Sequence, residues 1–399
     1  MSQLITVLFS PILSRVYDHG DFGIFASYNS TVMILSIICC GRFELAVVIP
    51  EKVQKSFSIV LLCLNISFAV ALVAFLGLLL THLFYNLIDI VFVALIPPII
   101  VLTAINISLN YFHNKITNFK INSAGRVIQS FVTGVVCVLF SNVGIVNGLI
   151  VGSFVGQCCV SLYLVINLPS EFSSSLFKIY HPNHFRELFL EHKQFPKHSL
   201  FPSFLNVFSS QAINYFLLYG FGAVTTGFYF FTSRVVLLPS SLISSSFSDV
   251  FFQNIVKKRR EFQPLLPFVI QNILILFGAG FVFAVFFYFF GTIIFSIAFG
   301  EKWLPAGGII KILVFGLLIK FVVSPLTIVF TALDKIQLGA LWQYFYFASY
   351  IGILMLLYFF KFEFYQSLIF ITGYEFIIYL IALYLIVNEV RLHDISLNH

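Results

Sequence analysis

We single out six ionisable side chains that lie inside long apolar stretches of this 399-residue chain. They are Arg42, Glu44, Arg234, Asp249, Lys311 and Lys320. An ionisable group in apolar surroundings is costly, so it needs a partner or a function. Arginine suits bidentate contacts to phosphate or carboxylate groups. We therefore expect anion binding and ion coupling at these positions, and we predict no catalytic residue.

The spacing of these residues limits how they can meet. Arg42 and Glu44 are about 200° apart around an ideal helix, so within one helix they cannot pair. Arg234 and Asp249 are about 60° apart and share one face at different depths. Lys311 and Lys320 are about 180° apart, so at most one of them faces a central cavity. Lys311 is close to a helix end, which makes Lys320 the better candidate.

Positive charge exceeds negative charge at depth by this count. The three deep cations Arg42, Arg234 and Lys320 outnumber the two deep acids Glu44 and Asp249. The excess favours a substrate with an anionic group such as a phosphate. The competing interpretation is structural, with the cations bonded to backbone carbonyls or to these acids. For Glu44 and Asp249, proton or sodium coupling competes with a position at the level of the lipid headgroups.

The composition excludes a water-soluble globular enzyme. The chain is 60% hydrophobic and only 10% charged, whereas a soluble domain is about 25% charged. Apolar runs recur along its length, and about 20 such residues cross a hydrocarbon core. These runs lack the alternation of a transmembrane β-barrel. The predicted fold is an all-α membrane protein.

Polar breaks divide the chain into twelve candidate spans, the first of which we interpret as a transmembrane helix rather than a signal peptide. The predicted spans cover residues 1–16, 24–49, 57–80, 87–110, 124–140, 145–168, 200–219, 225–250, 266–292, 306–331, 338–358 and 365–387.

The Lys and Arg residues give the orientation. Cytoplasmic loops retain these residues, and alternate loops hold fifteen of them against three on the opposite side. Both termini are therefore predicted to be cytoplasmic. The run 257–260 is better explained as a topology determinant than as a lipid-headgroup or nucleic-acid patch, so no nucleic-acid partner is expected.

The longest polar stretch, 169–199, divides the chain near its middle. We interpret it as a cytoplasmic linker between an N-terminal six-helix half, 1–168, and a C-terminal six-helix half, 200–399. A weak internal similarity supports two parallel repeats, because FGIF at 22–25 and TGFY at 226–229 open corresponding spans. Transporters built this way bind substrate near the midplane between the halves.

Other chemistry is not predicted. The four histidines at 181, 184, 192 and 198 match no zinc spacing, and no GxxxxGK[ST] phosphate loop occurs. All six cysteines lie in apolar spans, where they behave as small hydrophobic residues. We expect no metal and no cofactor.

Several segments resemble bacterial oligosaccharide flippases of the Wzx type, within the multidrug/oligosaccharidyl-lipid/polysaccharide exporter superfamily. They occur in the expected order along almost the whole chain. The segments are SRVYDHGDFGIFA at 14–26, GRFELAVVIP at 41–50, FP at 195–196, SRVVLLP at 233–239 and FGEKWLPAG at 299–307.

The resemblance implies a MATE-like fold and a flippase of undecaprenyl-pyrophosphate-linked oligosaccharide, for O-antigen or a related polysaccharide. The implied site is the bacterial inner membrane, among membrane lipids and beside polysaccharide polymerase machinery. Arg42, Arg234 and Lys320 would hold the substrate, and Glu44 and Asp249 would couple ions. A small-molecule or multidrug exporter shares the fold but favours a negative cavity. A membrane polymerase is predicted to carry a large outer loop, whereas every outer loop here has about a dozen residues or fewer.

Overall fold

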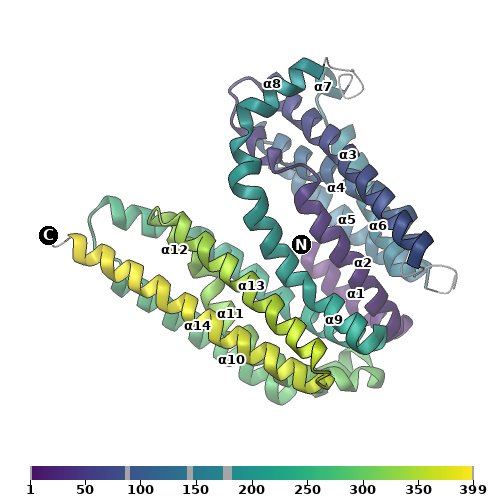
Figure 1. The fold of residues 1–399 in the computed structure, drawn as a ribbon, viewed down its shortest axis with the longest axis vertical. Helices are drawn as coiled ribbons and strands as arrows, with labels where there is room; N and C mark the ends of the chain where they lie inside the picture. The colour runs from purple at the N-terminus through teal and green to yellow at the C-terminus, as the bar shows by residue number, and fades with distance from the viewer. Residues whose placement is uncertain (1, 86–89, 142–146, 174–181, 398–399) are drawn as a thin grey trace. The chain divides into compact units, whose positions relative to one another are not determined.

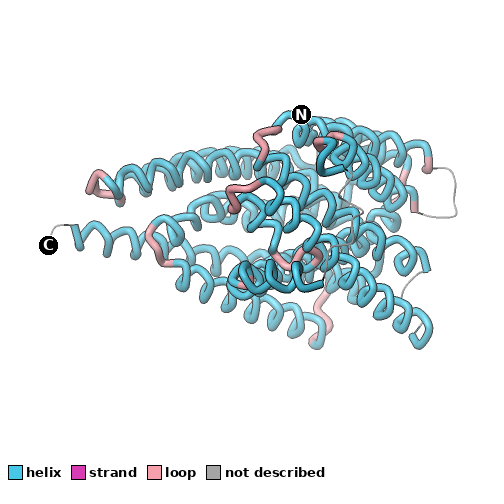
Figure 2. Tube along the Cα trace, turned by 90° about the horizontal axis from the view of Figure 1, so that it is seen from above, coloured by secondary structure: helices cyan, strands magenta, loops and turns pink. Residues whose placement is uncertain are grey.

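The chain folds almost entirely into helices. The computed structural model describes residues 2–85, 90–141, 147–173 and 182–397, without some side chains in these ranges, and this part contains no β-strand (Figure 2). The chain divides into two compact units, unit 1 at Met1–Tyr215 and unit 2 at Phe216–His399. The boundary between their residue ranges falls within one long helix. The sequence-based division instead places 200–215 with the second half, and it stays a prediction.

Unit 1 is a bundle of membrane-length helices with short helices after them (Figure 1). Its elements are α1 (Ser2–Val16), α2 (His19–Ile38), the 3-10 helix η1 (Phe43–Val48), α3 (Val53–Tyr85), α4 (Ile90–Lys115), α5 (Phe119–Leu139), α6 (Gly148–Ile166), α7 (Ser170–Ser173), α8 (Pro182–His192), the π-helix η2 (Pro196–Leu200) and the first part of α9 (Phe201–Arg260).

Unit 2 continues from α9 with further long helices. They and the short elements between them are α10 (Leu266–Phe299), the 3-10 helix η3 (Glu301–Trp303), α11 (Leu304–Val323), the 3-10 helix η4 (Ser324–Ile328), α12 (Val329–Ala332), α13 (Ile336–Phe359) and α14 (Phe364–Leu397).

The helices bear out an all-helical membrane protein. In the part of the chain described, nine helical segments are long and apolar enough to cross a membrane. They correspond to nine of the predicted spans. The span predicted at 1–16 is the shorter apolar helix α1, and those at 200–219 and 225–250 are both within α9. A non-helical residue, Gly222 (φ 85°, ψ 173°), interrupts α9 between them.

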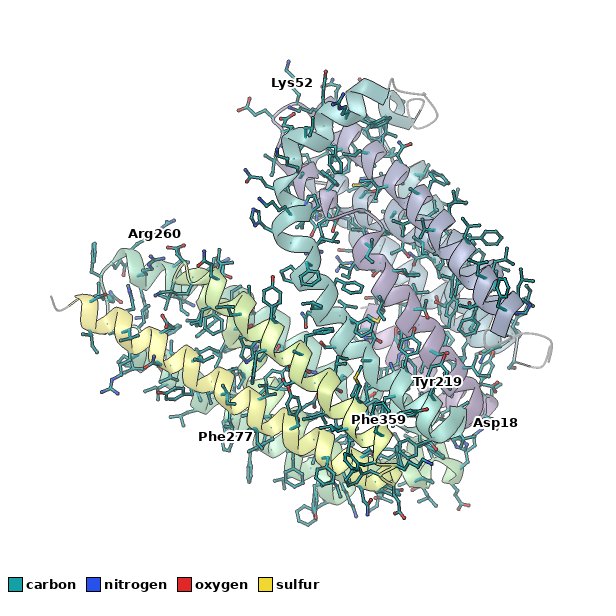
Figure 3. The ribbon with its side chains drawn as sticks, in the orientation of Figure 1. Asp18, Lys52, Tyr219, Arg260, Phe277 and Phe359 are labelled. Atoms are coloured by element: carbon teal, nitrogen blue, oxygen red, sulfur yellow. The ribbon has the colours of Figure 1, made fainter. Side chains whose placement is uncertain are left out.

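Apolar side chains cover the outside of the long helices. Phe277 on α10 points outward from unit 2 (Figure 3), and Phe277 and Phe359, at the end of α13, are 47% and 77% exposed. Only 17% of the apolar window of α10 is buried within the protein. A water-soluble protein does not expose so large an apolar area, so this surface faces lipid.

Small residues allow the helices of unit 1 to pack closely. A side chain at Gly152 or Gly156 on α6 would collide with Cys137 or Thr133 on α5. Gly134 on α5 likewise makes room for the Phe9 ring of α1. Close approach at small residues is how membrane helices gain contact without a hydrophobic driving force.

The segment that follows α6 docks on the start of α3. Lys55 Nζ donates a hydrogen bond to Glu191 Oε1 of α8 over 2.6 Å. The Phe189 ring packs against Phe43 of η1, with centroids 5.1 Å apart. His192 is buried beside them at the end of α8. This docking is the cytoplasmic face of unit 1 in the predicted topology.

The helices of unit 2 are held together in part by packing contacts between α10, α11 and α14. The Trp303 side chain is fully buried against Phe228 and Phe231 of α9. The Asp394 carboxylate of α14 accepts hydrogen bonds of 2.8 Å from the backbone N–H groups of Leu265 and Leu266. It thereby supplies partners for two N–H groups at the start of α10.

Candidate functional site

The end of α2 differs from the predicted helix and brings Arg42 to Glu44. The prediction that 24–49 is one helix is wrong after Ile38, where α2 ends. Gly41 (φ 58°) and Arg42 (φ 66°) both take left-handed backbone conformations, which turn the chain before η1. The 200° separation applied only to a continuous helix, so the prediction that the two side chains cannot pair is also wrong.

Arg42 links three parts of unit 1. Its Nη1 lies 3.3 Å from Glu44 Oε1, and its Nε donates a hydrogen bond of 3.1 Å to Ser199 Oγ in η2. The Glu44 side chain is 5% exposed and that of Arg42 is 22% exposed. Glu44 Oε2 is buried with no hydrogen-bond partner among the described residues. Arg42 therefore neutralises a buried carboxylate and joins the end of α2 to the entry of α9.

A second ion pair lies inside unit 2. Lys320 of α11 places Nζ 3.9 Å from Glu375 Oε1 of α14. The prediction that deep cations outnumber deep acids omitted Glu375, although it is within the predicted span 365–387. A list of every acid in the predicted spans finds it. With Glu375 the acids in this count also number three, so the count no longer gives an excess of positive charge.

Aromatic side chains surround this second pair. Lys320 Nζ lies 5.9 Å from the centroid of the Tyr379 ring, in the range of a cation–π contact. Tyr346 stacks between Tyr350 and Trp342, with centroid distances of 5.5 and 5.6 Å. The polar pair thus lies in a layer of phenol and indole rings contributed by α13 and α14.

The other predicted site residues are on unit 2. The Arg234 guanidinium carbon lies 5.9 Å from the Phe230 ring centroid on α9. Lys311 is exposed on α11. Asp249 is within α9, but its side chain is outside the described residues, so its shared face with Arg234 stays a prediction.

The four histidines of the central polar stretch are described only in part. Of the predicted set, His181 and the side chain of His184 fall outside what the structure describes. Among the described residues, no three His, Cys, Asp or Glu side chains converge as metal ligands would.

The fold and these paired charges define a multi-pass helical membrane protein with ion pairs between its helical segments. The chain belongs to a family of polysaccharide biosynthesis proteins, whose sequence pattern matches residues 12–307. The resemblance noted in the sequence is thereby confirmed. No curated protein sequence matches the chain.

Solved transporter structures share the fold. An inward-facing multidrug resistance MATE family transporter of the MOP superfamily matches with a TM-score of 0.72 at 13% identity, over 99% of this chain and 95% of its own. The lipid II flippase MurJ in an inward closed conformation matches with a TM-score of 0.68 at 12% identity, over 99% and 88%. A MOP superfamily transporter from Pyrococcus furiosus matches with a TM-score of 0.58 at 12% identity, over 100% and 93%. The MATE-like fold is confirmed.

Proposed function

We propose that the protein is a flippase for a lipid-linked oligosaccharide. Its substrate would be an undecaprenyl-pyrophosphate-linked repeat unit, for O-antigen or a related surface polysaccharide. Alternating access would carry the unit from the cytoplasmic to the periplasmic leaflet. The observation that carries the proposal is the match of residues 12–307 to polysaccharide biosynthesis proteins, and the fold shared with a lipid II flippase supports it.

The charged residues at depth would hold the pyrophosphate while the lipid tail stays in the bilayer. We assign Arg42, Arg234 and Lys320 to this task, because cations in low dielectric attract phosphate strongly. Arg42 and Lys320 each have a carboxylate neighbour, so substrate would have to share or replace that neighbour. Glu44 and Asp249 would couple transport to an ion.

The setting follows from the same proposal. The protein would lie in the bacterial inner membrane with both termini in the cytoplasm, and polysaccharide polymerase machinery would use its product. The Lys and Arg distribution supports this orientation.

Deletion and complementation test the proposal. Deletion of the gene in its own bacterium should abolish one surface polysaccharide, and the intact gene should restore it. The purified protein in proteoliposomes should expose a lipid-linked oligosaccharide, loaded in the inner leaflet, to an external lectin. Unchanged surface polysaccharide and no lectin access would refute the flippase.

A small-molecule exporter is the second candidate, because a multidrug MATE transporter shares the fold with a TM-score of 0.72. The deletion strain separates the two functions. Loss of an exporter would lower resistance to cationic dyes and leave the polysaccharide intact, whereas loss of a flippase would remove the polysaccharide and leave resistance unchanged.

A further inference from the structure

The charged groups of Lys320 and Glu375 are close to each other, but they are neither in tight contact nor fully buried. Nζ and Oε1 are 3.9 Å apart, whereas a charge-assisted hydrogen bond is about 2.7–2.9 Å. The Lys320 side chain is 33% exposed and that of Glu375 is 18% exposed. The ammonium group therefore attracts this carboxylate without being fully enclosed by it.

The Glu375 carboxylate lies close to the backbone of α11, the helix that carries Lys320. A Cβ at Gly316 of α11 would lie 3.2 Å from Glu375 Oε2 and 3.1 Å from the methyl group of Thr372. The absence of a side chain at Gly316 thus lets the carboxylate approach α11. The same acid interacts electrostatically with groups on several helices of unit 2. These groups are Lys320 on α11, Tyr229 on α9, Tyr346 and Tyr350 on α13, and Tyr374 and Tyr379 on α14.

We propose that Glu375 is a displaceable internal counter-ion, which occupies Lys320 until a pyrophosphate-bearing substrate takes its place. This inference rests on the proposed function. Without substrate, the carboxylate neutralises Lys320 and joins α11 to α14. A pyrophosphate carries more negative charge than one carboxylate, so it competes successfully for the ammonium group, whereas a singly charged anion does not. Glu375 thereby sets which anions unit 2 accepts.

Binding of farnesyl pyrophosphate to the full chain in nanodiscs tests this exchange at one fixed pH. Glu375→Gln removes the competitor and should bind the probe about tenfold more tightly, which is about 1.4 kcal/mol. Lys320→Gln should bind it at least tenfold more weakly. Chloride should inhibit binding to Glu375→Gln at concentrations that leave the wild type unaffected.

Matched controls distinguish displacement of Glu375 by pyrophosphate from a general effect of removing an acidic side chain or of binding the lipid tail. Glu389→Gln is the same change on the same helix, and it affects a different pair with Lys335 at 3.3 Å, so it should leave affinity unchanged. Farnesol lacks the pyrophosphate and should bind wild type and Glu375→Gln equally. Glu375→Asp withdraws the carboxylate by one methylene and should bind about threefold more tightly, which carries the test if Glu375→Gln does not fold.

Two failures point to different conclusions. Binding that depends on Lys320 but is equal or weaker in folded Glu375→Gln and Glu375→Asp would overturn the counter-ion while leaving the substrate site standing. Probe binding that is absent, or insensitive to Lys320, would remove both the counter-ion and the role of Lys320 in the proposed function.

Discussion

Arg42 makes structural contacts whose loss a single substitution cannot separate from the role that we propose for it in transport. Arg42→Ala leaves the buried Glu44 carboxylate without its cation and removes the link to Ser199. Loss of one partner of a buried pair costs about 3 kcal/mol or more. We therefore expect markedly less folded protein in the membrane, measured by quantitative immunoblotting.

A double variant separates structure from transport at this position. Arg42→Met with Glu44→Gln removes both charges, so protein abundance should recover while surface polysaccharide stays low. Arg126→Ala, at an exposed site on α5, is the matched control and should change neither measurement. Full polysaccharide in the double variant would exclude Arg42 and Glu44 from transport.

Residue types were predictable from the sequence, but their partners were not. The deep cations follow from hydropathy alone. The Arg42–Glu44 contact depends on two consecutive left-handed residues, a conformation that is uncommon for arginine and that the apolar pattern does not signal. The Lys320–Glu375 contact depends on α11 packing against α14, which requires tertiary structure.

The docking of α8 should weaken in acid. Burial lowers the pKa of His192 below its ordinary 6.5, although Glu191 opposes this shift. Below pH 6.5 the undocked segment thus binds more protons than the docked one, so stability falls as pH falls. The hydrogen bond from Lys55 lowers the pKa of Glu191, whose contribution is lost only at still lower pH. Hydrogen exchange in α8, corrected for intrinsic rates, should be several-fold faster at pH 5.5 than at pH 7.5.

Two variants identify the cause of this pH dependence. His192→Gln cannot titrate and should reduce the difference between the two pH values. Lys55→Ala should speed exchange at both, because Glu191 loses its partner at either pH. Equal protection of α8 in the wild type at pH 5.5 and 7.5 would contradict the assignment.

Element positions were predictable where the apolar runs are long, and less so where helices break. The span predicted at 306–331 is not one regular helix, because α11 ends at Val323 and Pro325 lies in a 3-10 turn. Proline removes a backbone donor, which explains the break, but sequence alone does not distinguish a kink from an end. The boundary between the spans in α9 was placed correctly around Gly222, whose positive φ suits glycine.

At the scale of the whole molecule, the sides of the membrane can be tested directly. Lys52 and Asp18 lie at opposite ends of unit 1, and Arg260 and Phe359 at opposite ends of unit 2 (Figure 3). Reporter fusions after Lys55, Lys120, Lys193, Arg260 and Lys335 should therefore report the cytoplasm.

Fusions near Asn86, Asn142 and Lys361 should report the periplasm, although Asn86 and Asn142 are outside the described residues. Two consecutive reporters on the same side would be incompatible with twelve spans. A discrepancy at Asn142 alone would require only that the predicted spans 124–140 and 145–168 be redrawn.

The Asp394 cap also dictates an order of events during biosynthesis. The backbone N–H groups at Leu265 and Leu266 receive their carboxylate from a residue 129 and 128 positions later in the chain. When α10 leaves the translocation machinery, Asp394 has not yet been synthesised, and water must satisfy those groups. Contacts between distant parts of a chain form late. The first turn of α10 is therefore completed only after α11, α13 and α14 have been made, so this end of unit 2 gains its final hydrogen bonds late.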